Sequence, residues 1–175
     1  MIKKSVSGLT TFAALSLFIL SLGLFSTAAA QTREEKSIAA VLQQNAVGFA
    51  KNDMSIIEKI WSNSESVVVF EGGHANYGWT DYRDTHLAPE MKEMTNTKYD
   101  FSDIKTKVSG NMAYATMKYA ISGDIGARHI EGAGLATAVL EKINGKWKIV
   151  HWHSSAPRRA APPTTTTAAP VQNQP

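Results

Sequence analysis

Four runs of strand length and strand composition occupy the second half of the chain, and they restrict the possible folds more than any other feature. They span residues 99–108, 112–122, 134–143 and 146–154 and are separated by short turns that contain glycine. Asn144-Gly145, between the last two runs, is the strongest two-residue hairpin pattern. The sequence therefore predicts a four-stranded antiparallel meander.

The first of these runs changes its apolar phase partway along. Tyr99 and Phe101 alternate in one phase, whereas Ile104 and Val108 follow the other. A single extra residue in a strand produces such a change, because side chains alternate between the two faces of a sheet. We expect a β-bulge that bends the sheet between Phe101 and Ile104.

Two helices are predicted before the meander. The capping pattern Thr32-x-x-Glu35 is followed by apolar residues at helical spacing, which predicts a helix of about 18 residues with Asn45 as its one polar interruption. The pattern Ser55-x-x-Glu58 begins a second, shorter helix.

A strand and a third helix complete the first half. The run 67–70 is rich in β-branched residues and apolar at both odd and even positions. We therefore expect a strand that is covered on both faces. Residues 79–87 predict a helix with Thr80 as its N-cap and an interruption at Pro89. The resulting order, α-α-β-α-β-β-β-β, is typical of the α+β class, with three helices on one face of a curved, mainly antiparallel sheet.

Two stretches of sequence resemble the small SnoaL-like domains of the nuclear transport factor 2-like superfamily, which have the cystatin-like cone fold. These stretches are Phe70-Glu71-Gly72…Gly78-Trp79…Tyr82-Arg83…His86-Leu87 and the closing segment Gly145-Lys146-Trp147-Lys148-Ile149-Val150-His151-Trp152-His153-Ser154-Ser155. The resemblance covers the whole expected folded unit.

The resemblance implies a pocket between the concave face of the sheet and the helices. The same cone carries isomerases, polyketide cyclases, dehydratases, binding modules and oligomerisation domains, so it does not fix one activity. Relatives with isomerase activity use an aspartate base on the sheet and an oxyanion site that contains a tyrosine. The sequence does not place that aspartate.

Residue spacing indicates which side chains enter such a pocket. Strand alternation puts Trp147, Ile149, His151 and His153 on one face of the last strand. Helical spacing puts a stripe of aromatic and polar residues on the third helix, ending at Glu90. The expected pocket residues are Glu71, His74, Trp79, Tyr82, Arg83, His86, His151 and His153.

Histidine titrates near neutral pH, so His86 and His151 are the candidate catalytic residues, with Glu71 as an orienting carboxylate. Proton transfer or water elimination on a small hydrophobic molecule is the expected reaction class. The competing interpretation is that these histidines and the aromatic residues of the third helix only pack in the core or line the pocket wall. Ligand binding without chemistry is a further alternative.

No metal or cofactor is expected. His151-x-His153 places two imidazoles on one strand face, but two ligands do not make a metal site, although His74, His86 or Glu71 could complete one. The glycines at 72, 73 and 78 are not followed by the Gly-Lys-Ser/Thr of a phosphate loop, so turn geometry explains them.

The N-terminal segment has the order of a secretory signal peptide. Lys3 and Lys4 precede an apolar stretch of about 14 residues, too short to span a bilayer, and Ala28-Ala29-Ala30 fits a cleavage site. The expected organisation is a signal peptide over 1–30, a folded domain over 31–155 and a Pro/Ala/Thr-rich disordered tail over 156–175. The alternative is an uncleaved anchor. Cleavage predicts a periplasmic or secreted protein with no membrane anchor.

Loss of residues 1–30 also changes the charge of the protein. It leaves 16 of the 18 basic residues against 15 acidic ones, a formal charge of +1. This balance gives no support for nucleic-acid binding, which requires a clustered basic face. The chain has no cysteine, so its stability depends on the core without disulfides.

The other face of the last strand predicts an interface. Alternation would leave Val150 and Trp152 on the outer face of the sheet, and exposed apolar surface of this kind usually marks an interaction site. We therefore expect a homodimer. A dimerisation or protein-interaction module without a small-molecule function is the alternative to a ligand-binding domain.

Overall fold

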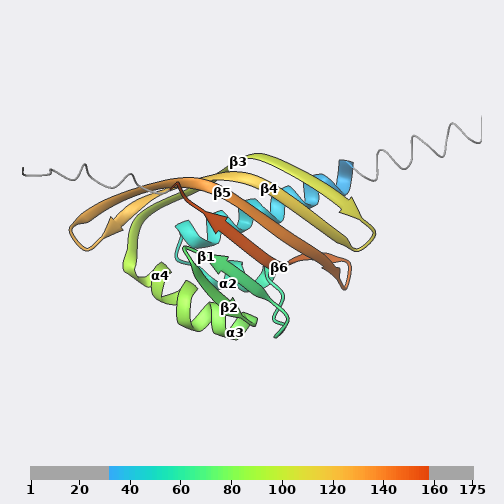
Figure 1. Cartoon of the computed structure of the whole chain (residues 1–175), viewed down its shortest axis with the longest axis horizontal. Helices are drawn as coiled ribbons and strands as arrows, with labels where there is room; N and C mark the ends of the chain where they lie inside the picture. Colours follow the sequence, from blue (N-terminus) through green and yellow to red (C-terminus); the bar gives the residue numbers. More distant parts are fainter. Residues whose placement is uncertain (1–31, 158–175) are drawn as a thin grey trace, which may run out of the picture.

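A six-stranded sheet in the order β2-β1-β6-β5-β4-β3 forms the centre of the fold (Figure 1). The computed structural model describes residues 32–157, so the expected signal peptide and residues 158–175 of the expected tail lie outside the described residues. A first helix, described over 32–50, is followed by α2 (Met54–Ile60), β1 (Val68–Glu71), β2 (His74–Tyr77), α3 (Trp79–Tyr82), the π-helical turn η1 (Arg83–Leu87), α4 (Ala88–Glu93), β3 (Met94–Ser109), β4 (Met112–Ile125), β5 (Arg128–Ile143) and β6 (Lys146–Ser155).

The predicted α+β class is confirmed. Strands β3 to β6 form the expected antiparallel meander, and β1 joins its edge by pairing parallel to β6. The strand β2 was not predicted. It forms a hairpin with β1 through Gly72 and Gly73, which both have positive φ, at 58° and 87°. Two consecutive residues with positive φ are typical of the tight hairpin turn that glycine allows.

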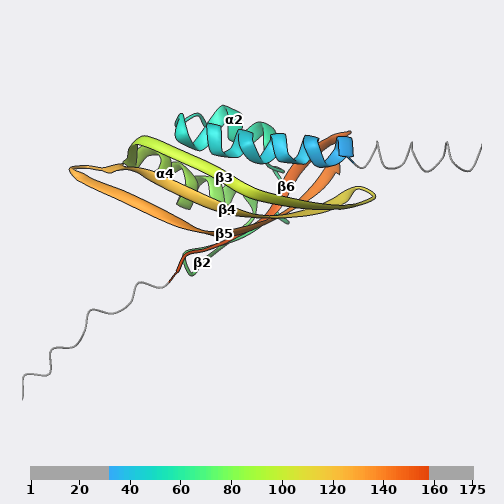
Figure 2. The same ribbon diagram turned by 90° about the horizontal axis from the view of Figure 1, so that it is seen from above.

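The first helix lies against the inner face of the sheet (Figure 2). Its buried residues include Ile38 and Leu42, which are fully covered. Small side chains occupy the inner face of β4 and β5, namely Ala113, Ala115, Ala136 and Ala138, and all four are buried. A side chain this small lets a helix approach the sheet closely. Within residues 32–157, no helix combines the length and the apolar character that crossing a bilayer requires.

Local capping differs from the prediction at the second and third helices. Asp53, not Ser55, caps α2, because its Oδ1 accepts a hydrogen bond of 3.0 Å from the backbone N–H of Ser55. Helix α3 begins directly after Gly78, so Thr80 lies inside the helix and not at its N-cap.

The helical segment continues through Pro89 without the predicted interruption. The chain widens into the π-turn η1 just before the proline, and the backbone N–H of Ala88 bonds to the carbonyl of Arg83, five residues back. An α-helical turn at this point would press the proline ring against the carbonyl four residues earlier. The π-turn avoids this contact, and Pro89 sits in the first turn of α4, where its missing N–H costs little.

The predicted bulge in β3 is present. The pairing of β3 with β4 shifts between Ser102 and Lys105, and Asp103 has a φ of 52°. The prediction that β1 is covered on both faces is wrong at its outer face. Val69 is fully buried, but Phe70 is 39% exposed, because none of the helices within residues 32–157 lies on that side of the sheet.

A second bulge, in β6, was not predicted and reverses the side-chain alternation of that strand. Leu140 of β5 pairs with Ile149 and Val139 pairs with His151, so Val150 is the extra residue. Trp147 and Ile149 are buried before the bulge, and Trp152 and Ser154 are buried after it. The expectation that Trp152 lies on the outer face is therefore wrong: this side chain is only 2% exposed.

Candidate functional site

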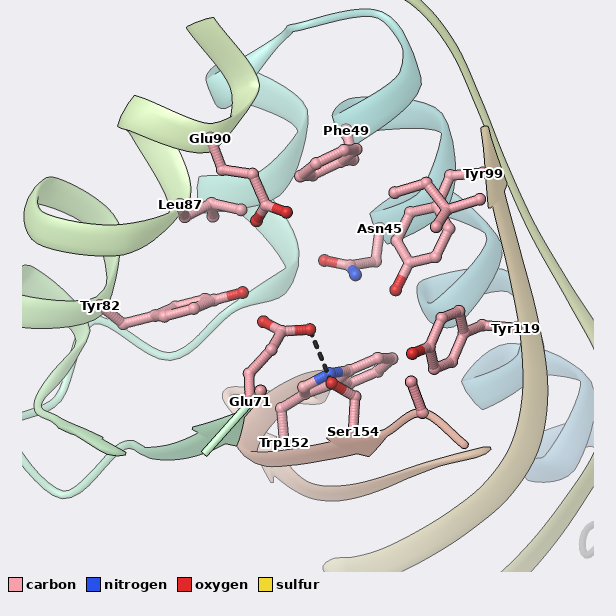
Figure 3. Close-up of a pocket in the computed structure, with 13 residues that line it drawn as sticks. Asn45, Phe49, Glu71, Tyr82, Leu87, Glu90, Tyr99, Tyr119, Trp152 and Ser154 are labelled. Carbon is pink, nitrogen blue, oxygen red and sulfur yellow. Dashed lines mark hydrogen bonds between the residues drawn. The ribbon is translucent and has the colours of Figure 1, made fainter. Parts of the chain in front are cut away.

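A cavity of about 210 Å³ lies between the inner face of the sheet and the helices (Figure 3). Its wall combines five aromatic rings with a small number of polar groups. The residues that line it are Asn45, Phe49, Glu71, Gly72, Tyr82, Leu87, Glu90, Tyr99, Tyr119, Ile121, Trp152, Ser154 and Ala156.

Three parts of the chain place these side chains. Asn45 and Phe49 are one turn apart on the first helix, and the π-turn brings Tyr82, Leu87 and Glu90 to the same side of the third helical segment. The sheet supplies the rest. Tyr99 pairs with Ile121 across β3 and β4, and Phe101 pairs with Tyr119, so the two tyrosines are diagonal neighbours on the inner face.

Glu71 is the last residue of β1, and it pairs in register with Ser154 of β6. Ser154 Oγ donates a hydrogen bond of 2.7 Å to Oε1 of this carboxylate. The second oxygen, Oε2, lies 3.9 Å from Nε2 of His86. Glu71 is therefore held on one side by the strand and faces a histidine on the other.

A buried amide fixes the orientation of His86. Its Nδ1 lies 2.9 Å from Oδ1 of Asn76, which is itself held by hydrogen bonds from its Nδ2 to Asp81 and Thr85. Because Asn76 sits on β2, the unpredicted strand positions the histidine. This arrangement directs Nε2 of His86 towards Glu71.

Glu90 has the most perturbed carboxyl group of the site. Burial, followed by the negative charges of Glu71 and Glu93, raises the pKa of Glu90 from 4.5 to about 7. A carboxyl group with this pKa can accept or release a proton at neutral pH. Neighbouring carboxyl groups that are shielded from water have raised pKa values, because two negative charges repel each other there.

The tyrosines of the cavity are hydrogen-bond donors. Burial raises the pKa of Tyr82 and of Tyr99 well above 10, and the charge of Glu71 adds to the shift in both. Burial also raises the pKa of Tyr119. All three hydroxyl groups therefore keep their protons at neutral pH, and Figure 3 shows them directed into the cavity.

Several polar groups of the wall are available to a ligand. Among residues 32–157, the hydroxyls of Tyr99 and Tyr119 and the carboxylate of Glu90 have no hydrogen bond to another side chain or to the backbone. Asn45, 8% exposed, accepts a 2.8 Å bond from the indole of Trp61 at Oδ1, and within the same residues its Nδ2 has no partner. No fully buried side-chain nitrogen or oxygen of the described residues lacks a hydrogen-bond partner, so these unpaired groups are reached by solvent and are open to a polar ligand.

The structure brings together only some of the residues that the sequence predicts for the pocket. Glu71 and Tyr82 line the cavity, and His86 stands beside Glu71 at its margin. His74 lies in a separate hollow on the other side of His86.

The other two predicted residues of the third helical segment do not reach the cavity. Trp79 is buried in the core, where it stacks on Trp61 with ring centroids 5.4 Å apart. Arg83 points away from the cavity and pairs with Asp84 and Glu58. The π-turn adds one residue to the turn and breaks the regular helical spacing. The side chains of this segment therefore point in different directions and do not all face the cavity.

The expectation that His151 and His153 enter the pocket is wrong. The bulge at Val150 turns both rings to the outer face, where they contact Phe70 with ring centroids 5.6 and 6.2 Å away. Trp152 and Ser154 take their places in the cavity wall. The predicted His-x-His pair and the cavity are thus on opposite faces of the sheet.

Sequence reasoning missed most of the polar wall. Asn45 is the polar interruption of the apolar stripe on the first helix, which is the one signal that marks it. Tyr99 and Tyr119 read as ordinary strand aromatics, and nothing in the local sequence shows the bulge that brings Trp152 and Ser154 inward.

One set of described residues has metal-ligand geometry. A ligand atom from each of Glu71, His86 and Glu90 lies within 4.8 Å of the others. A divalent cation is therefore a competitor for this end of the cavity.

The described residues form an α+β fold with a partly polar cavity between the sheet and the helices. The chain belongs to the SnoaL-like domain family, whose family model matches residues 38–159. This agrees with the resemblance found in the sequence.

Solved structures with the same fold support the assignment. A nuclear transport factor 2-like superfamily protein of Salmonella enterica is 18% identical, with a TM-score of 0.68 over 74% of this chain and 95% of its own. A "putative ketosteroid isomerase" of Shewanella frigidimarina is 23% identical, with a TM-score of 0.58 over 66% and 92%. A "putative dehydratase" of Streptomyces avermitilis is 15% identical, with a TM-score of 0.66 over 73% and 98%. The search of curated proteins finds no match.

Proposed function

We propose that the cavity binds a small organic molecule and that Glu90 transfers protons to and from it. The observation that carries this proposal is the meeting of Glu71, His86 and Glu90 within 4.8 Å at one end of an aromatic cavity. The pKa of Glu90, raised to about 7, suits a group that acts as both acid and base at neutral pH.

The proposed chemistry is proton transfer at a carbon next to a carbonyl group. The Glu90 carboxylate takes the proton, and the electron pair of the C–H bond moves onto the carbonyl oxygen as an enolate. Hydrogen bonds from Tyr99 and Tyr119 stabilise the charge that develops on this oxygen. In a substrate with a carbon–carbon double bond beyond that carbon, the charge extends along the double bond, and return of the proton from Glu90 to its far end completes an isomerisation. In a substrate with a hydroxyl group on the next carbon, the enolate electrons form a carbon–carbon double bond as the C–O bond breaks, and the hydroxyl takes the proton from Glu90 and leaves as water.

Two of the structures with the same fold are named for an isomerase and for a dehydratase. These names describe those proteins, and at under 25% identity the likeness extends to the fold alone. The proposal therefore depends on the cavity of this chain. His86 serves as a positioning residue in it, because its Nε2 faces the carboxylate of Glu71.

Deuterium exchange tests this proposal without knowledge of the natural substrate. The purified protein is incubated in D₂O with a panel of small ketones and one amino ketone, and NMR follows the loss of the proton next to the carbonyl. We expect exchange above the buffer rate, and Glu90→Gln to reduce it about 100-fold or more, as for loss of a general base. Glu141→Gln, an exposed site on β5, is the control. Equal rates for the wild type and Glu90→Gln would refute the role of Glu90.

A homodimer formed through the outer face of the sheet is a second proposal. Phe70, Tyr114 and Leu135 on this face are 39%, 51% and 61% exposed. Exposed apolar residues on neighbouring strands favour an interface. Sedimentation should show a dimer at micromolar concentration that Leu135→Glu dissociates. Val47→Glu, on the first helix, should leave it intact, and a monomeric wild type would count against this interface.

We also propose that the protein is exported and acts in the periplasm or outside the cell. The support is the order of charge, apolar stretch and alanines in residues 1–30. Mass spectrometry of the protein produced in a secreting bacterial host should give an N-terminus at Gln31. A retained residue 1 would indicate an uncleaved anchor.

A further inference from the structure

The charge of the cavity wall restricts its ligand. Glu71 and Glu90 are the charged residues among those that line it, and no lysine or arginine lies with them in the wall formed by the described residues. Arg83, on the same helical segment as Glu90, is directed away towards Glu58 and Asp84. An anionic ligand would therefore be repelled, whereas a cationic ligand would give these two partly buried carboxylates a counter-charge.

The rings of the wall favour a positive charge as well. Phe49, Tyr82, Tyr99, Tyr119 and Trp152 surround the space into which the carboxylates point (Figure 3). The face of an aromatic ring attracts a cation, and the attraction grows when the cation is removed from water. Tyr82 is only 5% exposed and Trp152 only 2%, so a cation bound here is well shielded.

The spacing of the acidic groups fits one ammonium nitrogen. Carboxylate oxygens of Glu71 and Glu90 lie within 4.8 Å of each other. A charged N–H donor sits about 2.8 Å from the oxygen that accepts it. A single protonated amine nitrogen can therefore donate to both carboxylates at once. A quaternary ammonium has no N–H, but its positively charged methyl groups can contact both carboxylates in the same place.

The opposite end of the cavity offers hydrogen-bond donors. Figure 3 shows the carboxylates on the side of Tyr82, and the hydroxyls of Tyr99 and Tyr119 across the cavity, with the amide of Asn45 between. These groups suit an oxygen atom on the ligand. The space, about 210 Å³, equals the liquid volume of about seven water molecules, so the ligand is small.

We propose that the ligand is a small organic cation, an amine or quaternary ammonium compound that also carries a hydroxyl or carbonyl oxygen. The cation lies between Glu71 and Glu90 against the aromatic rings, and the oxygen faces Tyr99 and Tyr119. This proposal rests on the proposed function, because both use the same cavity, and it replaces the expected hydrophobic ligand with a charged one.

Ligand probes of matched shape and different charge test the proposal. Choline is compared with 3,3-dimethyl-1-butanol, in which carbon replaces the charged nitrogen, and butylamine is compared with butanol and with butanoate. Thermal unfolding and calorimetry of the purified protein measure the effect of each. We expect the two cations, at millimolar concentration, to raise the melting temperature by a few degrees, and the neutral and anionic partners to leave it unchanged.

Two variants localise the binding. Glu71→Gln and Glu90→Gln should each weaken the binding of choline about tenfold or more, whereas Glu141→Gln on exposed β5 should not change it. Neutral probes that stabilise the protein as well as the cations do would overturn the proposal. Stabilisation by Mg²⁺ or Zn²⁺ with none by the amines would also overturn it and assign the carboxylates to a metal.

The two proposals fail in different ways. Binding of choline or butylamine without any deuterium exchange would support the cationic ligand and remove the catalytic role of Glu90. Exchange of neutral ketones that depends on Glu90, with no binding of the cations, would support the acid–base role and refute the cationic ligand.

Discussion

Ser154 donates a hydrogen bond of 2.7 Å to the carboxylate of Glu71 across the parallel pairing of β6 with β1. The contact depends on a residue four positions earlier, because only the extra residue at Val150 turns Ser154 to the inner face. The position of the acidic group in the cavity is thus tied to an irregularity of the strand.

Replacement of Ser154 by alanine should destabilise the domain by about 1 kcal/mol. It removes a donor from a partly buried carboxylate, and hydrogen bonds to charged groups are worth about 1.5–3 kcal/mol, less where water can replace the donor. Urea denaturation measures the difference. Ser155→Ala, at the exposed neighbouring position, is the matched control, and equal losses for the two variants would contradict the assigned contact.

Deletion of Val150 should leave the domain folded, because Val150 is the extra residue of the bulge. Without it the strand alternates regularly, with His151 still on the outer face and Trp152 still on the inner face. Deletion of Lys148, where the pairing holds no extra residue, should instead move Trp147 out of the core and cost about 3 kcal/mol or more. Urea denaturation followed by circular dichroism compares the two deletions, and equal midpoints would show that the bulge does not set the phase.

Much of the fold follows from local sequence patterns. The strands of the meander, the Asn144-Gly145 turn and the bulge near Asp103 were all predictable, because each is marked by alternation or by turn residues within a few positions. The short strand β2 was not, since its four residues form a strand only by pairing with β1.

The site was less predictable than the fold. Glu71 and Tyr82 were identified, whereas His151 and His153 were assigned to the wrong face. In β3 a change in the alternation of apolar residues reveals the bulge. In β6 no such change is visible, because histidine alternates with tryptophan or serine after Val150. One phase places the two histidines on the inner face, and the other places Trp152 there. Tertiary packing decides between them, and Trp152 buries more apolar surface than a histidine does.

Gly134 leaves room for Tyr119 in the cavity wall. A Cβ atom at position 134 would lie 2.7 Å from the Tyr119 hydroxyl and would also collide with the backbone oxygen of Ser155. Gly134→Ala should therefore cost about 1–3 kcal/mol, as overpacking does.

Gly132 provides the matched control on the same strand. A Cβ atom there meets only Cγ2 of Ile121, at 3.3 Å, so Gly132→Ala should have a small effect. Thermal unfolding of both variants gives the comparison. If Gly134→Ala is tolerated as well as Gly132→Ala, Tyr119 is not held in place by this close approach. Loss of choline binding in Gly134→Ala alone would further support the role of Tyr119 in the cavity.

The raised pKa of Glu90 predicts how the stability of the domain depends on pH. The folded state binds this proton more tightly than the unfolded state, because the pKa is about 7 when folded and 4.5 ordinarily. The cost of burying the charge is absent below about pH 4.5, grows as the pH rises towards 7, and is complete above it. A difference of this size corresponds to about 3 kcal/mol. Glu90→Gln does not titrate, so its stability relative to the wild type should rise by about that amount between about pH 4 and about pH 8. Urea denaturation at both pH values measures this change, with Glu141→Gln as control, and a difference independent of pH would show that folding does not raise the pKa of Glu90.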